Sequence, residues 1–278
     1  MNKIAVFGVK GMLGNAVYNI FNQAKYDIIS IDINNINAEK ASTKEINKFI
    51  GNSDYIINCI GIIKPYINDN NPLEIERAIK VNSLFPHILS QTGIKNIQIA
   101  TDCVFDGLKG NYSESDKHNA LDVYGKTKSL GEVQSKNFMN LRCSIIGPEI
   151  KNKKSLLEWF INQPLNSTVN GFKNHFWNGI TTYAFAKICK GIIDNEIWFD
   201  GLQHIIPLNT INKADMLKIF AKEFNRNDIN IIDINATEAI DRTICTLNSQ
   251  RNKQLWKLAG YNQIPTIEEL IKEIKTYA

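Results

Sequence analysis

The amino-acid sequence predicts an α/β fold built on a doubly wound parallel sheet, and three observations support this prediction. Over the first 150 residues, short apolar runs rich in β-branched residues alternate with longer amphipathic segments. A glycine-rich turn directly follows the first of these runs, and the alternation ends soon after residue 147. Alternating strands and helices are typical of a parallel sheet with helices on both faces, in which ligands bind outside the carboxyl ends of the strands.

The first half of the predicted sheet begins near the N-terminus. The run at 3–8 (KIAVFG) is predicted to be a strand and the amphipathic segment at 13–24 a helix. A strand at 26–32 (YDIISID) follows. An amphipathic helix is then expected at 43–51, and an apolar strand at 53–61 (SDYIINCIG).

The second half repeats the same alternation. A helix is expected through 72–93, a strand at 94–102 (IKNIQIATD), a helix from about Tyr124 and a strand at 138–147 (FMNLRCSIIG). Because a helix separates each strand from the next, we expect neighbouring strands to be parallel.

The character of the chain changes after 147–149. All four tryptophans lie beyond residue 150, and the strand–helix rhythm breaks up there. We therefore divide the chain into a first domain at 1–150 and a smaller C-terminal region at 151–278, which we expect to supply a lid and substrate contacts. No Gly/Ser- or Pro-rich linker separates them, so the second region should pack closely on the first.

The composition is that of an ordinary globular protein. The chain has 278 residues, 44% hydrophobic and 22% charged, which suffices for one large domain or two closely joined ones without disulfides or a metal. Its formal net charge of +4 is spread over stretches of mixed sign, so we expect no nucleic-acid partner. The small excess of positive charge is compatible with a polyanionic ligand.

The cysteines and the apolar runs favour a cytoplasmic location. The five cysteines are an odd number without CxxC spacing, as expected for reduced thiols in the cytosol. The N-terminus has no signal-peptide pattern, and the longest apolar run, around YIINCIGII, is shorter than the ~18 residues of a membrane span. The four histidines have no metal-binding spacing. We therefore expect neither a membrane anchor nor a metal.

The glycine-rich turn predicts a dinucleotide site. Gly8, Gly11 and Gly14 lie in VFGVKGMLGNAV, between the first strand and the first helix. Glycine permits a tight turn and lets backbone N–H groups approach a pyrophosphate, which then rests at a helix N-terminus. In this context the pattern predicts a Rossmann-type NAD(P)-binding domain over 1–150. We include Met12 and Leu13, at the start of the helix, among the cofactor contacts.

Asp32 follows the second predicted strand. A carboxylate at this place accepts hydrogen bonds from the ribose hydroxyls of the adenosine, which favours NADH over NADPH. The alternative is an aspartate that only caps a turn. Use of both NADH and NADPH also stays open.

Tyr124 and Lys128 are four residues apart in DVYGKTKSLGE. On a helix, side chains at this spacing lie on the same face. Such a pair alone is common on solvated helices. Thr101, however, lies at the carboxyl end of the predicted strand 94–102, where a sheet of this kind binds its ligands. The three residues together predict a catalytic constellation.

Four ordered motifs carry a family resemblance. The sequence has GxxGxxG at 8–14, ATDCVFDG at 100–107, YxxxK at 124–128 followed by LGE, and LRCSIIGP at 141–148. Together they resemble the extended short-chain dehydrogenase/reductases, and within these the dTDP-4-dehydrorhamnose reductase group. The resemblance implies reduction, by NADPH or NADH, of the C4 ketone of a nucleotide-activated 4-keto-6-deoxyhexose.

The resemblance also implies roles for individual residues. Thr101, Tyr124 and Lys128 take the Ser/Thr-Tyr-Lys positions. Tyr124 would donate a proton to the alkoxide that hydride delivery creates, and Lys128 would lower the pKa of the phenol and hold the nicotinamide ribose. Thr101 would orient the carbonyl group. Further cofactor contacts are expected at Asn82 and in the NCIG loop, at Asn58, Cys59, Ile60 and Gly61. Asn82 could instead only satisfy helix backbone groups, or serve in a water relay to Lys128.

The substrate follows less directly from the resemblance. Cys103 stands where rhamnose reductases usually have tyrosine, and the loop NCIGIIKP is bulkier than theirs. The segments INCIGIIKP, NSLFPHIL and SLLEWF are similar to a subgroup from surface-polysaccharide pathways, such as those of O-antigen and capsule. That subgroup implies a UDP-2-acetamido-2,6-dideoxy-L-hexos-4-ulose as the alternative to dTDP-4-dehydro-L-rhamnose. The expected substrate contacts are Thr101, Asp102, Cys103, Val104, Lys64, His175 and Trp177. Asp102 could equally cap a turn, and His175 and Trp177 could equally serve in packing.

Two other functions remain open. A nucleotide-sugar C4 epimerase would use the same Thr-Tyr-Lys constellation. A non-catalytic NAD(P)-binding regulator could retain the same fold. A dehydratase is disfavoured, because the sequence reads TDC where such enzymes usually read TDE. Short-chain reductases often form homodimers, but no heptad repeat or apolar stripe in this sequence indicates a particular interface.

Overall fold

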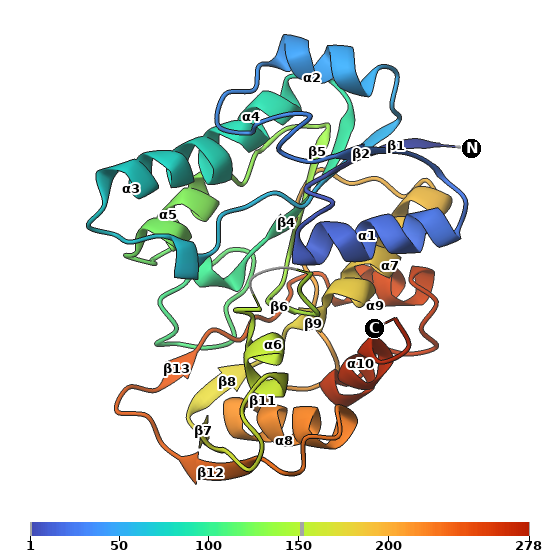
Figure 1. Ribbon diagram of the computed structural model, residues 1–278. Helices are drawn as coiled ribbons and strands as arrows, with labels where there is room; N and C mark the ends of the chain where they lie inside the picture. The colour runs from blue at the N-terminus through green and yellow to red at the C-terminus, as the bar shows by residue number, and fades with distance from the viewer. Residues whose placement is uncertain (1, 151–152, 278) are drawn as a thin grey trace.

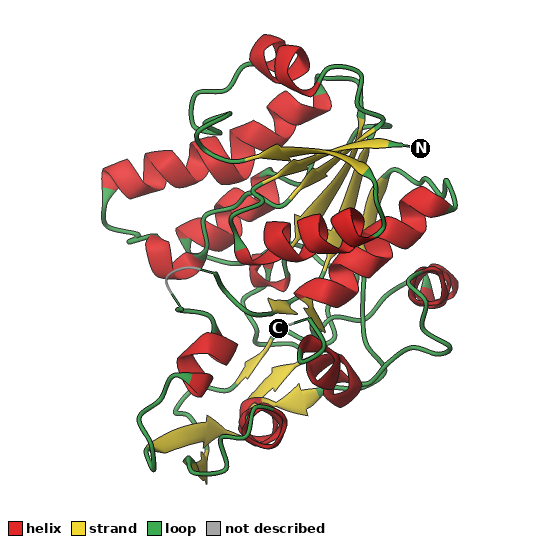
Figure 2. Cartoon of the chain, turned by 45° about the vertical axis from the view of Figure 1, so that its right-hand side comes forward, coloured by secondary structure: helices red, strands yellow, loops and turns green. Residues whose placement is uncertain are grey.

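The computed structural model describes residues 2–150 and 153–277. Within these residues the centre of the molecule is a six-stranded sheet, which Figure 2 shows between layers of helices. In spatial order its strands are β2 (Asp27–Ile31), β1 (Lys3–Phe7), β3 (Tyr55–Asn58), β4 (Lys95–Ala100), β5 (Phe138–Arg142) and β10 (Gly201–His204). Every neighbouring pair is parallel. The predicted α/β fold with a doubly wound parallel sheet is confirmed.

One face of the sheet is covered by α1 (Met12–Gln23) and α7 (Thr182–Asp194), which pack against each other. The apolar residues of both helices form one core with strand side chains such as Ile57 and Met139. Outside this layer, α9 (Ser249–Leu258) packs against α7. Strands buried on both faces need apolar side chains on both sides, which explains why these runs read as continuously apolar in the sequence.

The opposite face is covered by α2 (Thr43–Ile50), α5 (Val123–Leu130) and a long helix at 72–90. The long helix consists of α3 (Pro72–Ala78), the π-helical turn η2 (Ile79–Leu84) and α4 (Phe85–Ser90). Ile56 and Phe138 belong to the core on this side. A π-helical turn inside an α-helix is rare and often marks a functional site.

The chain leaves the main sheet at Ser144. The sequence predicted one strand at 138–147, but the structure has β5 and then the short strand β6 (Ile145–Ile146), which pairs with β9 (Ile180–Thr181). The Ser144 carbonyl accepts a hydrogen bond from the Ile180 N–H at 2.9 Å, and its hydroxyl accepts one from the Trp177 indole at 2.7 Å. These bonds turn the chain toward the C-terminal region.

The C-terminal region lies at the carboxyl ends of the main strands, in the lower half of Figure 1. Its core contains Phe160, Trp177 and Phe220. The remaining elements are α6 (Leu156–Ile161), β7 (Thr168–Phe172), β8 (His175–Trp177), β11 (Ile211–Asn212), α8 (Lys213–Glu223), β12 (Asn230–Ile234), β13 (Ile240–Asp241) and α10 (Ile267–Ile274). Residues beyond 150 also return to the main sheet, since β10, α7 and α9 belong to its layers. In the described ranges, no helix has the length and apolar character needed to cross a membrane.

Candidate active site

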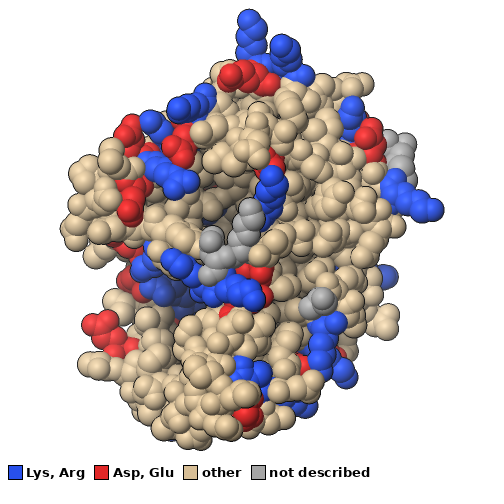
Figure 3. Space-filling model, viewed as in Figure 1, with Lys and Arg blue, Asp and Glu red and all other residues tan. Residues whose placement is uncertain are grey.

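A cavity of about 640 Å³ lies between the carboxyl ends of the main strands and the C-terminal region. Figure 3 shows the hollow on this face, with lysine and arginine side chains at its edge. The cavity brings together residues that are far apart in the sequence. Of the predicted site residues, those that line it are Gly11, Met12, Leu13, Cys59, Ile60, Gly61, Thr101, Asp102, Cys103, Tyr124, Lys128, His175 and Trp177.

The glycine turn has the shape that its sequence predicts. Gly8 has a φ of +85°, in the left-handed region that favours glycine. A Cβ atom at Gly14 would lie 2.1 Å from the Gly8 carbonyl oxygen, so only glycine allows this close approach. Helix α1 begins at Met12, and the Gly11 before it offers no side chain to cap the free N–H groups. These N–H groups are therefore free to bind an anion in the cavity.

Asp32 lies directly after β2, beside the glycine turn. Its carboxylate forms an ion pair with Lys10 and accepts a hydrogen bond from the Asn34 N–H at 2.7 Å. These partners, the Lys10 ammonium first, hold the pKa of Asp32 below its usual value. Lys10 lines the cavity, whereas its partner Asp32 does not. The carboxylate is thus ionised and held next to the turn.

The NCIG loop borders the cavity through only three of its four residues. Cys59, Ile60 and Gly61 line it, whereas the Asn58 side chain is buried beneath the loop and accepts a hydrogen bond from the Ile60 N–H at 3.1 Å. The Asn58 side chain therefore does not line the cavity, contrary to the direct cofactor contact expected for it.

Asn82 is also placed behind the loop. From the π-helical turn η2, its amide accepts a hydrogen bond from the Ile62 N–H at 2.8 Å and donates one to the Ile62 carbonyl at 2.9 Å. It also donates to the Thr127 hydroxyl of α5 at 3.2 Å. Asn82 was predicted to contact the cofactor directly. In the structure its side chain instead holds the loop and α5 together.

Thr101, Tyr124 and Lys128 meet at one wall of the cavity. Helix α5 begins directly after Asp122, whose carboxylate accepts a hydrogen bond from the Gly125 N–H at 2.7 Å. A Cβ atom at Gly125 would lie 2.5 Å from the Cys103 carbonyl oxygen, so this glycine lets α5 approach the turn after β4. The Lys128 ammonium donates to the Ile99 carbonyl of β4 at 3.1 Å.

Burial dominates the pKa values of the tyrosine and the lysine. It raises the pKa of Tyr124 far above the usual value of a phenol, and the hydrogen bond with Thr101 only partly opposes this. It lowers the pKa of Lys128 to about 8, against the opposing charge of Glu132. The net shift of the Tyr124 pKa is thus upward and is dominated by burial. The lowering of this pKa by Lys128 stays a prediction. The phenol is neutral, which is the form that can donate a proton.

The predicted substrate contacts divide into two groups. Asp102, Cys103, His175 and Trp177 line the cavity. Burial raises the pKa of Asp102, while the positive charge of Arg242 opposes the rise.

Two predicted contacts lie elsewhere. Val104 is completely buried in a small apolar cluster with Phe105 and Tyr112, so its side chain is not available to a ligand. Lys64 forms an ion pair with Asp122 at 2.8 Å and does not line the cavity. It supports the residue that caps α5.

Several polar residues at the cavity were not predicted from the sequence. Lys213, at the start of α8, and Arg242, just beyond β13, line it together with Tyr66 and Lys154. Burial lowers the pKa of Lys213, and the negative charge of Asp102 partly restores it. No motif surrounds these residues, and only the fold brings them to the first domain. In the described part of the chain, no group of histidine, cysteine, aspartate and glutamate could hold a metal ion.

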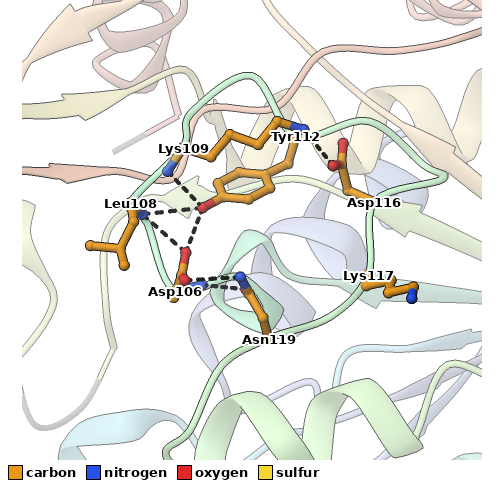
Figure 4. A pocket seen from close by; sticks show the side chains of 7 residues that line it. All are labelled: Asp106, Leu108, Lys109, Tyr112, Asp116, Lys117 and Asn119. Atoms are coloured by element: carbon orange, nitrogen blue, oxygen red, sulfur yellow. Dashed lines mark hydrogen bonds and ion pairs between the residues drawn. The ribbon is translucent and has the colours of Figure 1, made fainter.

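A second hollow lies in the loop around Asp106 and Tyr112 (Figure 4). The Tyr112 hydroxyl donates to Asp106 at 2.6 Å and accepts from the N–H groups of Leu108 and Lys109 at 3.1 and 3.0 Å. Asn119 donates to the second oxygen of Asp106 at 2.9 Å. These groups bond to each other and stabilise the loop, so we assign no ligand to this hollow.

The chain is similar to several known proteins. A family model described as the RmlD substrate binding domain matches residues 1–276. A dTDP-4-dehydrorhamnose reductase from Aggregatibacter actinomycetemcomitans is 29% identical over 226 residues, which are 73% of the length of each chain. The "Methionine adenosyltransferase 2 subunit beta" of Danio rerio is 24% identical over 242 residues, 80% of this chain and 74% of that one.

Solved structures share the fold over the whole length. The crystal structure of a dTDP-4-dehydrorhamnose reductase from Bacillus anthracis, in complex with NADP, superposes with a TM-score of 0.80. It is 17% identical, and all of both chains is covered. The architecture that holds the cavity is therefore that of a known group of α/β proteins.

Proposed function

The chain belongs to the family described as the RmlD substrate binding domain, and on this premise we propose that it is an NAD(P)H-dependent reductase of nucleotide sugars. The reaction is reduction of the C4 ketone of a nucleotide-activated 4-keto-6-deoxyhexose. The observation that carries the proposal is the meeting of Thr101, Tyr124 and Lys128 in the cavity that the glycine turn also borders.

The residues present fit a dinucleotide cofactor. The uncapped start of α1 offers N–H groups to a pyrophosphate, and the close approach of Gly14 to Gly8 forms the tight turn that such a group needs. When bound, the nicotinamide supplies a hydride to the ketone carbon. Asp32 can accept hydrogen bonds from ribose hydroxyls, while Lys10 can bind a 2′-phosphate. This pair supports use of both NADH and NADPH.

The proton comes from Tyr124. Its phenol is neutral because it is buried, so it can donate a proton to the oxygen on which negative charge develops. The Thr101 hydroxyl, at the end of β4, orients the same oxygen. Lys128 stabilises the phenolate that proton transfer creates, since the new negative charge and the Lys128 ammonium attract each other.

The substrate end of the cavity supports a sugar joined to a nucleoside diphosphate. Lys154, Lys213 and Arg242 line it, and such cations bind phosphate oxygens. Cys103 leaves space where a larger side chain would not, which favours a sugar with a bulky C2 substituent. We therefore favour a UDP-2-acetamido-2,6-dideoxy-L-hexos-4-ulose over dTDP-4-dehydro-L-rhamnose, used in the cytoplasm for surface polysaccharides such as O-antigen or capsule.

One comparison favours a second candidate function. A relative that matches 80% of this chain is described as a subunit of methionine adenosyltransferase. By this likeness the chain would be a binding subunit of another enzyme rather than an enzyme by itself. Such a subunit would bind NAD(P)H without turning it over.

Cofactor oxidation tests the proposal. The purified protein is mixed with NADH or NADPH and either 4-keto sugar, each freshly generated, and the loss of absorbance at the nicotinamide band is followed. We expect oxidation with one of the sugars and none with the Tyr124→Phe variant. Tight cofactor binding without oxidation with either sugar would reject the reductase and favour a C4 epimerase or the non-catalytic subunit.

A further inference from the structure

Three amide side chains form a row across the centre of the buried parallel sheet. Asn58 of β3, Gln98 of β4 and Asn140 of β5 are register neighbours on adjacent strands. Their exposed fractions are 1%, 2% and 0%. Strands covered on both faces are normally apolar, so three consecutive amides at this depth require an explanation.

The three amides are joined by hydrogen bonds. Asn58 donates to the Gln98 side-chain oxygen at 2.8 Å, and the Gln98 nitrogen faces the Asn140 side-chain oxygen at 3.4 Å. We call Asn58, Gln98 and Asn140 the amide ladder. Gln98 is its centre, because it bonds to both neighbours.

Each end of the amide ladder holds a backbone segment of the proposed active site. At one end, the Asn58 oxygen accepts from the N–H of Ile60, in the loop that lines the cavity. Gln98, at the centre, donates to the Gly131 carbonyl at 2.8 Å, and Asn140, at the other end, donates to the Val133 carbonyl at 2.9 Å. Gly131 directly follows α5, the helix that carries Tyr124 and Lys128. The amide ladder therefore joins the loop to the catalytic helix from behind the cavity.

Asn82 forms a second connection between the same two segments. It binds both backbone groups of Ile62 and the Thr127 hydroxyl of α5. The end of α5 is also fixed by contact, since a Cβ atom at Gly131 would lie 1.9 Å from the Asn82 carbonyl oxygen. Two independent sets of hydrogen bonds, one through the amide ladder and one through Asn82, thus hold the loop after β3 in place relative to helix α5.

Asn96 provides a comparison within the same strand. It is as deeply buried as Gln98 and lies two residues earlier on the same face of β4. Its amide donates only to the carbonyls of Ile94 and Leu89, at 2.7 and 3.4 Å, away from the cavity. Asn96 therefore contributes a buried amide without a connection to the active site.

We propose that the amide ladder, through Gln98, positions helix α5 against the 59–61 loop and so sets where Tyr124 lies relative to the cofactor and the ketone. Fully paired polar groups in a protein interior favour one arrangement, because any shift leaves a buried group unpaired. Gln98 touches neither ligand and is a positioning residue. This inference rests on the proposed reductase function.

Kinetics of Gln98→Met test the proposal, with Asn96→Leu as the matched control. Methionine has a similar length but cannot bond to Asn58 and Gly131. We expect kcat of Gln98→Met to fall about 10- to 100-fold, because small misplacements of reacting groups have effects of this order, while KM for the cofactor changes much less. Asn96→Leu should lose thermal stability and keep the wild-type kcat. Equal kcat values in Gln98→Met and the wild type would overturn the proposal.

Gln98→Glu adds a readout that a purely structural role would not change. A buried carboxyl group has a raised pKa, and its protonated form can both accept from Asn58 and donate to the Gly131 carbonyl. We expect the kcat of Gln98→Glu, relative to wild type, to recover as the pH falls. A pH-independent ratio would contradict the proposal.

Hydrogen exchange separates failure of this inference from failure of the proposed function. In Gln98→Met, amide exchange should become faster in both 59–62 and 123–131, and in Asn96→Leu it should not. This readout needs no turnover. An inactive wild type would reject the reductase alone, whereas unchanged exchange in Gln98→Met would reject the positioning role of the amide ladder.

Discussion

Tyr124 is the residue on which the proposed chemistry depends. Replacement by phenylalanine removes the hydroxyl and keeps the ring that fills the buried site. We expect turnover to fall by ~100-fold or more, the scale of a lost general acid, while cofactor affinity stays the same. Steady-state rates and fluorescence titration with NADPH check both parts. Tyr18→Phe, on α1 away from the cavity, is the control. A variant Tyr124→Phe with wild-type turnover would remove Tyr124 from the reaction.

Gly14 tests the cofactor site. A methyl group at this position would lie 2.1 Å from the Gly8 carbonyl oxygen. Because that oxygen belongs to the backbone and cannot rotate away as a side chain can, the turn must shift. We expect Gly14→Ala to weaken NAD(P)H binding at least tenfold, equal to about 1.4 kcal/mol. Isothermal titration measures the Kd, with Asn15→Ala on the same helix as the control. Undiminished binding in Gly14→Ala would contradict the assignment of the glycine turn.

Single residues differ in how far the sequence could predict them. Thr101, Tyr124 and Lys128 could be predicted, because their spacing and their place after a strand have a physical meaning without any tertiary contact. Lys213 and Arg242 could not, since each is an isolated cation whose importance comes from long-range packing. Asn58 and Asn82 were predicted near the cofactor, but they act from behind the loop, and only the hydrogen-bond geometry reveals this.

At the scale of elements, helix α8 contributes one of the cations by which the C-terminal region lines the cavity. Lys213 stands at its start and lines the cavity, whereas Lys218 on the same helix pairs with Asp233 at 2.7 Å on the surface. We expect Lys213→Met to raise KM for the nucleotide sugar about 10- to 100-fold, since a hydrogen bond to a charged group contributes ~1.5–3 kcal/mol. The Kd for NADPH should not change. Lys218→Met should leave both constants unchanged; an equal effect of the two variants would contradict a substrate contact at Lys213.

The elements of the first domain were largely predictable, and those beyond it were not. Strands β1 to β5 are mostly apolar and separated by amphipathic helices, so local pattern is sufficient. Strand β10 reads GLQH and pairs with β5, about 60 residues earlier in the chain, so its sequence alone gives no sign of a sheet. The division of the predicted strand 138–147 depends on hydrogen bonds from Trp177 and Ile180 to Ser144, which no local pattern contains.

At the scale of the whole molecule, a buried polar cluster joins β5, β10 and the loop before α5. The Arg142 side chain of β5 is completely buried. It donates to both carboxylate oxygens of Glu132, at 2.7 and 2.6 Å, and contacts His118 and His204 at 2.6 and 2.9 Å. Its role is structural. The cluster connects the C-terminal region to the end of the catalytic helix.

This cluster makes stability depend on pH. Burial, followed by the positive charge of Arg142, lowers the pKa of His204 to about 4. In the unfolded chain a histidine has a pKa of about 6.5. Between these values the unfolded state binds a proton that the folded state does not, so stability is lost as the pH falls from 6.5 toward 4. Burial lowers the pKa of His118 as well, which acts in the same direction.

Thermal unfolding between pH 7.5 and 4.5 measures this effect. We expect the Tm of the wild type to fall over this range and that of His204→Gln to fall less, because glutamine has no proton to take up. The exposed His87→Gln serves as the control and should keep the wild-type slope. Identical slopes in all three proteins would show that His204 is not the group responsible.

The proposed reaction transfers a hydride to the C4 carbon of a nucleotide sugar, and isotope labelling follows that hydride. The protein is incubated with the 4-keto sugar and NADPH or NADH deuterated at the transferred position, and the product is analysed by mass spectrometry and NMR. We expect a sugar one mass unit heavier than the unlabelled product, with deuterium at C4 and a hydroxyl in place of the ketone. Recovery of the ketone unchanged, or of an epimer without deuterium, would contradict it.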